Sequence, residues 1–233
     1  MLDVQSLEAW YGQAQVLYGV SLGVNAGECV ALVGRNGAGK STTMKAIMGL
    51  MARRRGRMVF RGTDISTLPS YRIGRLGLGW VPEDRRIFTD LSVRENLAVA
   101  RQGPRDGAPT WTEEKLYALF PNLAAMPDRP GGRMSGGEQQ MLTVARTLMG
   151  NPYLVLLDEP SEGVAPLIVE EMARMIVALK KEGVSILLSE QNLHFARLVA
   201  DRAVVLEKGE VKFVGAMDAL MSDEVLLRTH LSV

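Results

Sequence analysis

Short runs of apolar residues, bounded by glycine, proline and asparagine, predict most of the β-strands of this chain. The first two runs alternate loosely between apolar and polar positions, as strands with one buried face do. Later runs are continuously apolar, which is typical of parallel strands that are buried on both faces. The predicted strands are residues 2–9, 16–24, 28–33, 57–61, 78–81, 153–157, 184–188, 203–206 and 211–214.

Between about residues 83 and 150 the pattern changes from β-rich to helical. Residues 92–95 and 135–138 each read Ser-x-x-Glu, a capping box that predicts a helix start, and residues 110–113 can cap another helix between them. A later helix is predicted from Pro166 to the glycine at position 183. The chain is therefore expected to form a mostly parallel α/β core that is interrupted by a helical insertion.

One glycine-rich segment, residues 34–41, fits the pattern G-x-x-x-x-G-K-[ST]. It lies between the predicted strand 28–33 and a segment that can continue as a helix, which is the context of a phosphate-binding P-loop. Glycines let the backbone turn its N–H groups toward anionic oxygens, and the helix start adds more N–H groups and a positive dipole end. Lys40 is predicted to reach the β- and γ-phosphates, and the Ser41 hydroxyl to bind Mg²⁺. The predicted nucleotide ligands here are Gly34, Arg35, Asn36, Gly37, Ala38, Gly39, Lys40, Ser41 and Thr42.

Two acidic residues, Asp158 and Glu159, follow the predicted strand 153–157. Ligands of a parallel sheet bind beyond the carboxyl ends of its strands, which is where the P-loop also lies. Asp158 is therefore predicted to hold Mg²⁺, directly or through water, alongside Ser41. Glu159 is predicted to orient the attacking water or accept its proton. The alternative is an acidic strand end that only caps the next turn, and the neighbouring P-loop makes it the weaker interpretation.

A second anion-binding pattern lies at the start of the helix predicted after residue 135. Two glycines expose backbone N–H groups there, beside a hydroxyl, so Ser135, Gly136, Gly137 and Glu138 are predicted nucleotide ligands. The alternative is an ordinary capped helix. Because the chain has one P-loop but two such helix starts, a single nucleotide held between two copies would use both.

Composition and charge exclude only a few classes of function. The chain has 233 residues, is 47% hydrophobic and carries a net charge of +1, so it has no strong field for nucleic acid. Its lone Cys29 excludes an internal disulfide and fits a reducing compartment. We expect neither a transmembrane helix nor a signal peptide, hence a cytosolic chain whose membrane role would come through a partner. The run Arg53-Arg54-Arg55 is expected to be a solvated loop.

The P-loop, then Ser135-Gly136-Gly137-Glu138-Gln139, then Leu156-Leu157-Asp158-Glu159-Pro160, occur in an order and spacing that resemble an ABC-type ATPase over essentially the whole chain. The resemblance implies an α/β fold: a P-loop NTPase (RecA-like) core with a mostly parallel sheet, an N-terminal antiparallel β part and a helical insertion. It implies one ABC ATPase domain, residues 1–233. Residues 1–82 and 151–233 would form the nucleotide-binding core, and about 83–150 a helical subdomain that carries the signature motif.

The same resemblance implies ATP and Mg²⁺ as cofactors and adds Tyr11, which would stack on adenine. A half-buried aromatic residue at a strand end is the alternative interpretation of Tyr11. In the family, two cassettes enclose two ATP molecules head to tail. Each site pairs the P-loop of one subunit with the Ser-Gly-Gly segment of the other.

Three positions depart from the usual family pattern. Glu83 stands where a glutamine usually contacts Mg²⁺, and a carboxylate is also a competent Mg²⁺ ligand. Ala165 stands where an aspartate is usual, which puts the usual cross-subunit contact there in doubt. Gln191 stands at the position of the switch histidine. Its amide NH₂ can donate to the γ-phosphate but cannot carry a proton charge, so we assign Gln191 to the catalytic residues together with Glu159.

Residues 81–88, 161–166 and 190–192 are together similar to one subgroup, the ATP-binding subunits of branched-chain (hydrophobic) amino acid importers. This similarity implies a peripheral ATPase on the cytoplasmic face of the plasma (inner) membrane. Its partners would be a second ABC ATPase subunit, integral membrane permease subunits and, indirectly, an extracytoplasmic solute-binding protein, with no nucleic acid. The sequence is compatible with a homodimer and a heterodimer. Import of urea or short amides, and a non-transport soluble ABC ATPase, are the alternatives.

Overall fold

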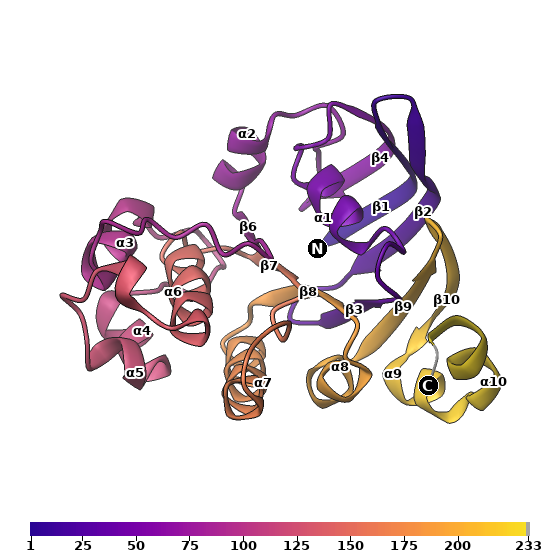
Figure 1. Ribbon diagram of the computed structural model, residues 1–233. Helices are drawn as coiled ribbons and strands as arrows, with labels where there is room; N and C mark the ends of the chain where they lie inside the picture. The colour runs from indigo at the N-terminus through magenta and orange to yellow at the C-terminus, as the bar shows by residue number, and fades with distance from the viewer. Residues whose placement is uncertain (232–233) are drawn as a thin grey trace.

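Two β-sheets form the centre of the computed structural model, which describes residues 1–231 (Figure 1). The smaller sheet is antiparallel and has the strand order β2-β1-β4-β5. The larger sheet has the order β10-β9-β3-β8-β7-β6, in which only β10 runs antiparallel to its neighbour. The strands are β1 (Leu2–Tyr11), β2 (Ala14–Val24), β3 (Cys29–Val33), β4 (Arg53–Phe60), β5 (Thr63–Asp64), β6 (Leu78–Val81), β7 (Leu154–Asp158), β8 (Ser185–Glu190), β9 (Arg202–Glu207) and β10 (Glu210–Ala216).

Helices cover the sheets and form a separate group at one end of the molecule. Figure 1 shows α3 to α6 gathered on the left, α7 and α8 below the larger sheet, and α9 and α10 at the lower right. None of the described helices is long and apolar enough to cross a membrane. The helices are α1 (Lys40–Ile47), α2 (Ser70–Arg75), α3 (Val93–Ala100), α4 (Glu113–Leu119), α5 (Pro121–Ala124), α6 (Gly136–Leu148), α7 (Pro166–Lys181), α8 (Leu193–Val199), α9 (Met217–Ser222) and α10 (Glu224–Leu226), with a 3₁₀ turn (Gly131–Arg133) and a terminal π-helical turn (Leu227–Leu231).

The strand β7 is buried on both faces, and its alternate residues enter two different cores. Val155 and Leu157 belong to the core that β6, α6 and α7 share, whereas Leu154 and Leu156 face the core that contains α1 and the smaller sheet. This division follows from the two-residue period of a strand. It explains why the sequence here is continuously apolar instead of alternating.

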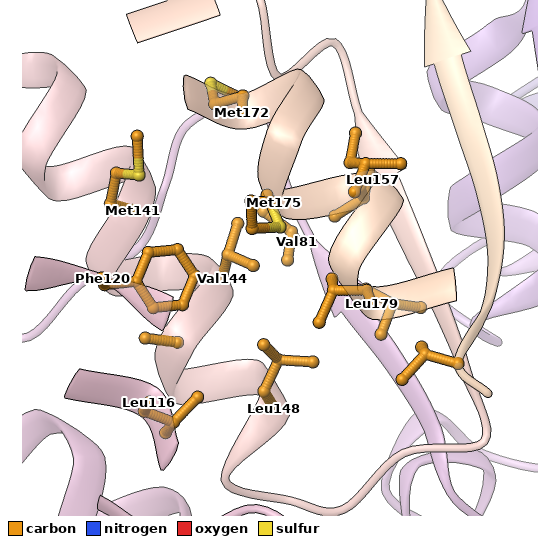
Figure 2. Packing of buried hydrophobic residues seen from close by; sticks show 14 of the residues in the cluster. Val81, Leu116, Phe120, Met141, Val144, Leu148, Leu157, Met172, Met175 and Leu179 are labelled. Carbon is orange, nitrogen blue, oxygen red and sulfur yellow. The ribbon is translucent and has the colours of Figure 1, made fainter. Parts of the chain in front are cut away.

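The helical group is attached to the larger sheet by continuous apolar packing. Figure 2 shows this core, to which the sheet, α4, α6 and α7 all contribute. Burial of these side chains packs α6 and α7 against the larger sheet. The residues labelled in the figure are Val81, Leu116, Phe120, Met141, Val144, Leu148, Leu157, Met172, Met175 and Leu179.

The structure corrects one expectation about the basic run 53–55. These arginines do not form a loop: they begin β4, which pairs with β1, although Arg53 and Arg55 are exposed to solvent. Arg53 lies over the Trp10 ring at 4.6 Å, and Arg54 donates to the carbonyl oxygens of Met51 and Leu68. Burial lowers the pKa of Arg54. An arginine can occupy such a strand because its stem packs on apolar surface while its guanidinium finds acceptors.

Candidate functional site

The P-loop connects β3 to α1, as the sequence predicts, and its glycines are sterically required. Gly37 and Gly39 have φ of 78° and 108°, a region that side chains rarely adopt. At Gly34 a Cβ atom would collide with the carbonyl oxygen of Leu206 on β9. The N–H of Gly209, in the β9–β10 turn, donates to the Ala38 carbonyl oxygen at 2.9 Å. The hairpin of β9 and β10 therefore packs against the P-loop and hydrogen-bonds to it.

Lys40, the first residue of α1, is 3% exposed and lies over the loop. Its Nζ donates to the carbonyl oxygens of Gly34 at 2.8 Å and Arg35 at 3.2 Å. It also forms an ion pair with Glu159, at 3.0 Å from Nζ to Oε1, in which both side chains are largely buried. The structure thus brings together two residues that the sequence predicts to act on the same phosphate group.

Ser41 and Asp158 also meet, although they are far apart in the sequence. The Ser41 hydroxyl donates to Asp158 Oδ1 at 3.0 Å, and the Ser189 hydroxyl donates to the same oxygen at 2.9 Å. Burial raises the pKa of Asp158, and the two hydroxyl donors oppose that rise. A hydroxyl and a carboxylate at this distance supply the hard oxygen ligands that Mg²⁺ prefers.

Glu159 follows the last residue of β7 in an unusual backbone conformation. Its φ is 44°, which is uncommon for a residue with a side chain, and its N–H donates to the Ser189 carbonyl oxygen at 3.0 Å. Glu162 returns toward it, since its N–H donates to the Glu159 carbonyl oxygen. A hydrogen bond with the Glu159 side chain raises the pKa of Glu162 to about 7.

Of the three positions that depart from the family pattern, Glu83 and Gln191 are exposed and follow the carboxyl ends of β6 and β8, and Ala165 is the N-cap residue of α7. The negative charge of Glu83 contributes to the raised pKa values of Asp158 and Glu162, so it lies on the same edge of the sheet. Gln191 directly follows β8. Tyr11 lies at the turn between β1 and β2 and is 50% exposed.

The Ser135–Glu138 segment begins α6 with the predicted capping box. The Ser135 hydroxyl accepts from the Glu138 N–H, and Glu138 accepts from the Ser135 N–H, which holds the pKa of Glu138 below its ordinary value. Gly137 lies against Ile168, where a Cβ would approach to 3.0 Å. The helix α6 packs on α3, α5 and β6, whereas α1 packs on β1, β2, β7 and β8 (Figure 1). Within one chain the two predicted anion sites therefore belong to different parts of the fold.

Sequence reasoning missed two polar residues at this edge, Ser189 and Glu190. The predicted strand ended at residue 188, but β8 continues to Glu190, because its ladder pairs Ser189 with both Leu32 and Asp158 and pairs Glu190 with Val33. Both side chains are buried. A polar pair directly after a continuous apolar run was the signal that could have found them.

The site geometry defines a class of protein, namely a P-loop nucleotide-binding protein whose site lies at the carboxyl edge of a mostly parallel sheet. Comparison with known families agrees with this class. The family model described as ABC transporter matches residues 17–162, which is more than half of the chain. The chain belongs to this family and is an ATP-binding subunit of an ABC transporter.

Similar proteins of known name serve different cargoes. A high-affinity branched-chain amino acid transport ATP-binding protein, BraG of Pseudomonas aeruginosa, is 41% identical, with 96% of each chain covered. A lipopolysaccharide export system ATP-binding protein, LptB of Haemophilus influenzae, is 35% identical and covers 99% of this chain and 97% of its own. The crystal structure of a nucleotide-free ATP-binding cassette from an ABC transporter superposes with a TM-score of 0.83 at 25% identity, covering 100% and 98% of the two chains. The predicted fold class is thus confirmed.

Proposed function

We propose that this protein hydrolyses ATP to drive the import of branched-chain or related amino acids. The observation that carries the hydrolytic part is the convergence of Lys40, Ser41, Asp158 and Glu159 at one sheet edge. These side chains come from a P-loop and from the end of β7, and each is predicted to handle a different part of one phosphate group. The established family membership supports ATP as the nucleotide.

The phosphate ligands in this proposal are the P-loop residues from Gly34 to Thr42. Backbone N–H groups of the loop and of the α1 start would bind the phosphate oxygens, and Lys40 would bind the β- and γ-phosphates. Since an ammonium has three N–H donors, a phosphate oxygen would replace one of the present acceptors, Gly34, Arg35 or Glu159. Tyr11 would stack on the adenine ring, a contact worth about 1–3 kcal/mol in other base–aromatic pairs.

Mg²⁺ fits the donor set that this edge offers. Among residues 1–231 the structure has no group of three or more His, Cys, Asp or Glu side chains that could hold a metal alone. A Mg²⁺ ion would therefore be held by Ser41, by Asp158 and, at the edge, by Glu83, with the remaining ligands from phosphate and water. The ion would neutralise charge that develops on the phosphate oxygens.

Glu159 and Gln191 are the proposed catalytic residues. The Glu159 carboxylate would accept a proton from the attacking water, a role that its place beside Lys40 supports. The Gln191 amide would donate to the γ-phosphate oxygens from the end of β8.

A second ATPase subunit would complete the site. We propose that Ser135, Gly136, Gly137 and Glu138 of one subunit bind the nucleotide held by the P-loop of the other, which would explain two glycines in the first turn of a capped helix. Residues 1–82 with 151–233 would form the nucleotide-binding core, and about 83–150 the helical subdomain. Residues 232 and 233 lie outside the described part of the chain.

The assembly would sit on the cytoplasmic face of the inner membrane, with permease subunits and, indirectly, an extracytoplasmic binding protein. Amino-acid cargo is supported by the 41% identity to BraG and by the residue patterns at 81–88, 161–166 and 190–192. The 35% identity to LptB supports lipopolysaccharide export as the second candidate function. Import of urea or short amides would use the same nucleotide site, and a soluble role apart from transport would use it without a permease.

The hydrolytic assignment is tested with Glu159→Gln. Removal of the base should lower the rate of ATP turnover by at least about 100-fold, because general base catalysis contributes 10²–10⁴-fold. ATP binding should persist, because all P-loop residues are kept and a phosphate oxygen can replace Glu159 as the acceptor for Lys40. Rates come from phosphate release, and binding from equilibrium titration. Glu170→Gln, an exposed residue of α7 that pairs with Arg174, is the matched control. Near-normal turnover in Glu159→Gln would overturn the assignment.

Cargo and partners are tested by affinity purification of the tagged chain from detergent-solubilised membranes. Integral permeases should be recovered with it, and reconstituted vesicles should take up leucine only when ATP is present. Recovery of the chain alone as an RNA-bound soluble species would reverse the proposal. ATP-dependent release of lipopolysaccharide, without leucine uptake, would favour the second candidate function.

A further inference from the structure

The Glu190 carboxylate lies at the carboxyl end of β8 and is 2% exposed. Its Oε1 accepts from the Ser161 N–H at 3.1 Å. Its Oε2 accepts from the Ser161 hydroxyl at 3.0 Å and from the Asn192 N–H at 3.2 Å. One carboxylate thus joins the segment that follows β7 to the segment that follows β8.

A buried carboxylate is costly unless its oxygens are satisfied. Burial raises the pKa of Glu190, while the bonds from Ser161 and Asn192 favour the ionised form. An apolar residue would complete β8 without that cost, since the strand is buried throughout and residues 186–188 are apolar. The three donors therefore point to a task at this position other than core filling.

The connected segments contain both proposed catalytic residues. Ser161 is two residues beyond Glu159, with only Pro160 between them, and a proline has a fixed φ. Gln191 lies between Glu190 and Asn192, so the bond to the Asn192 N–H spans it. Asn192 in turn caps α8 by accepting from the Phe195 N–H. A shift at the Glu190 carboxylate would be transmitted to Glu159 on one side and to Gln191 on the other.

We infer that Glu190 is a positioning residue that holds Glu159 and Gln191 at a fixed separation by clamping Ser161 and Asn192. This inference rests on the proposed function, because it concerns the geometry of ATP hydrolysis. Glu190 contacts neither of the reacting groups directly in this arrangement. It acts through the backbone of Ser161 and Asn192.

The test compares Glu190→Gln and Ser161→Ala with the wild-type chain. In Glu190→Gln an amide NH₂ replaces one acceptor oxygen. This donor would then face another donor, either the Ser161 N–H or the Asn192 N–H, and that hydrogen bond would be lost. We expect kcat to fall by about 10-fold or more, because small misplacements of reacting groups are costly in rate. The ATP dissociation constant should change by less than about threefold, because the P-loop is not involved. Ser161→Ala should lower kcat less, by about threefold, and Ser161→Thr, which keeps the hydroxyl, should restore it.

A double-mutant comparison of kcat distinguishes a positioning role of Glu190 from a general loss of structure. Because Gln191→Ala already removes one of the two residues that Glu190 positions, Glu190→Gln should lower kcat by a smaller factor in the Gln191→Ala background than in the wild-type chain. Independent effects would instead multiply.

Ser185→Ala is the matched control at the opposite end of β8. Its hydroxyl accepts from the Gly27 N–H at 2.9 Å, so the variant also removes a buried bond between this strand and a loop. We expect a lowered Tm with unchanged kcat. If Glu190→Gln and Ser161→Ala behave in the same way, with kcat retained and only Tm lowered, the inference is wrong.

These experiments distinguish failure of the inference about Glu190 from failure of the proposed function. A wild-type chain without ATP turnover would refute the proposed function, whereas an active wild type with unaffected Glu190 and Ser161 variants refutes only the clamp. Should Glu190→Gln fail to fold, the kcat of Ser161→Ala and Ser161→Thr decides, since these changes are smaller and Ser161 is only partly buried.

Discussion

Lys40 and Glu159 form a buried ion pair that joins the proposed phosphate ligand to the proposed base. Both side chains are nearly inaccessible, with 2% and 9% exposure. Removing one member of a buried pair leaves an uncompensated charge, which typically costs about 3–5 kcal/mol. A phosphate that attracts Lys40 would relieve this pairing and leave Glu159 available to a water molecule. Binding and activation of the base would then be consecutive effects of one interaction.

Gln191 offers the sharpest residue-level prediction, because it replaces an expected histidine. Gln191→Ala should slow hydrolysis by about 100-fold, the loss that follows removal of one donor aimed at developing charge. Gln191→His should be tolerated, since a neutral imidazole can also donate. Single-turnover hydrolysis measures both variants. Gln5→Ala, an exposed glutamine of β1 bonded to Asp3, is the control. A harmless Gln191→Ala would make this residue a spectator.

At the scale of elements, the P-loop depends on the hairpin of β9 and β10 as much as on its own strand and helix. The Gly209 N–H supports the Ala38 carbonyl oxygen, and the Gly209 carbonyl accepts from the Tyr18 N–H of β2. Leu17 and Leu206 pack against Gly39. The loop conformation is therefore set jointly by both sheets.

Gly34→Ala tests this support. The added methyl group would overlap the Leu206 carbonyl oxygen, so either the loop or β9 must move. We expect destabilisation by about 1–3 kcal/mol, typical of overpacking, together with weakened ATP binding. Chemical denaturation and nucleotide titration measure the two effects. Gly103→Ala should change neither, since a Cβ atom at that position would have no neighbour within 4 Å and the φ of Gly103 is ordinary. Equal behaviour of the two variants would contradict the argument.

The sequence predicted the elements whose pattern is local and missed those decided by tertiary pairing. The P-loop and both capping boxes follow from residues close together in the chain, and all are present. Arg53-Arg54-Arg55 looks like a loop by charge, but pairing with β1 and stacking on Trp10 make it a strand. Likewise, the polar end of β8 is extended by two neighbouring strands.

Within the candidate site, the motif residues could be predicted from the sequence, but the residues that hydrogen-bond to them or to their segments could not. The contact of Ser41 with Asp158 follows from where parallel strands end. The contribution of Ser189 depends on strand order, which places β8 between β3 and β7. The clamp formed by Glu190 depends on the path of the chain after β7. The polar pair Ser189-Glu190 after an apolar run could have drawn attention to both residues, but the partners of their side chains are decided by tertiary structure.

For the whole molecule, the arrangement of the two proposed anion-binding helix starts is the decisive feature. The start of α1 lies between the two sheets, whereas the start of α6 belongs to the helical group beside β6 (Figure 1). A continuous apolar core packs the helical group against the larger sheet (Figure 2). In the proposed dimer, the α6 start of a second subunit would meet the P-loop of the first.

Self-association of the Glu159→Gln variant tests whether the α6 start of one subunit pairs with the P-loop of another. Because this variant should bind ATP without consuming it, ATP should convert it from monomer to dimer, as measured by light scattering. Adding Ser135→Arg should prevent dimer formation, because a bulky side chain at the start of α6 would keep the partner's phosphate away. ATP affinity of the monomer should persist, since the P-loop is unchanged. Arg133→Ala, at an exposed position two residues earlier, serves as the control and should still dimerise. An ATP-bound chain that stays monomeric would exclude pairing with itself and leave a sister ATPase to complete the site. Dimerisation unaffected by Ser135→Arg would place the interface elsewhere on the molecule.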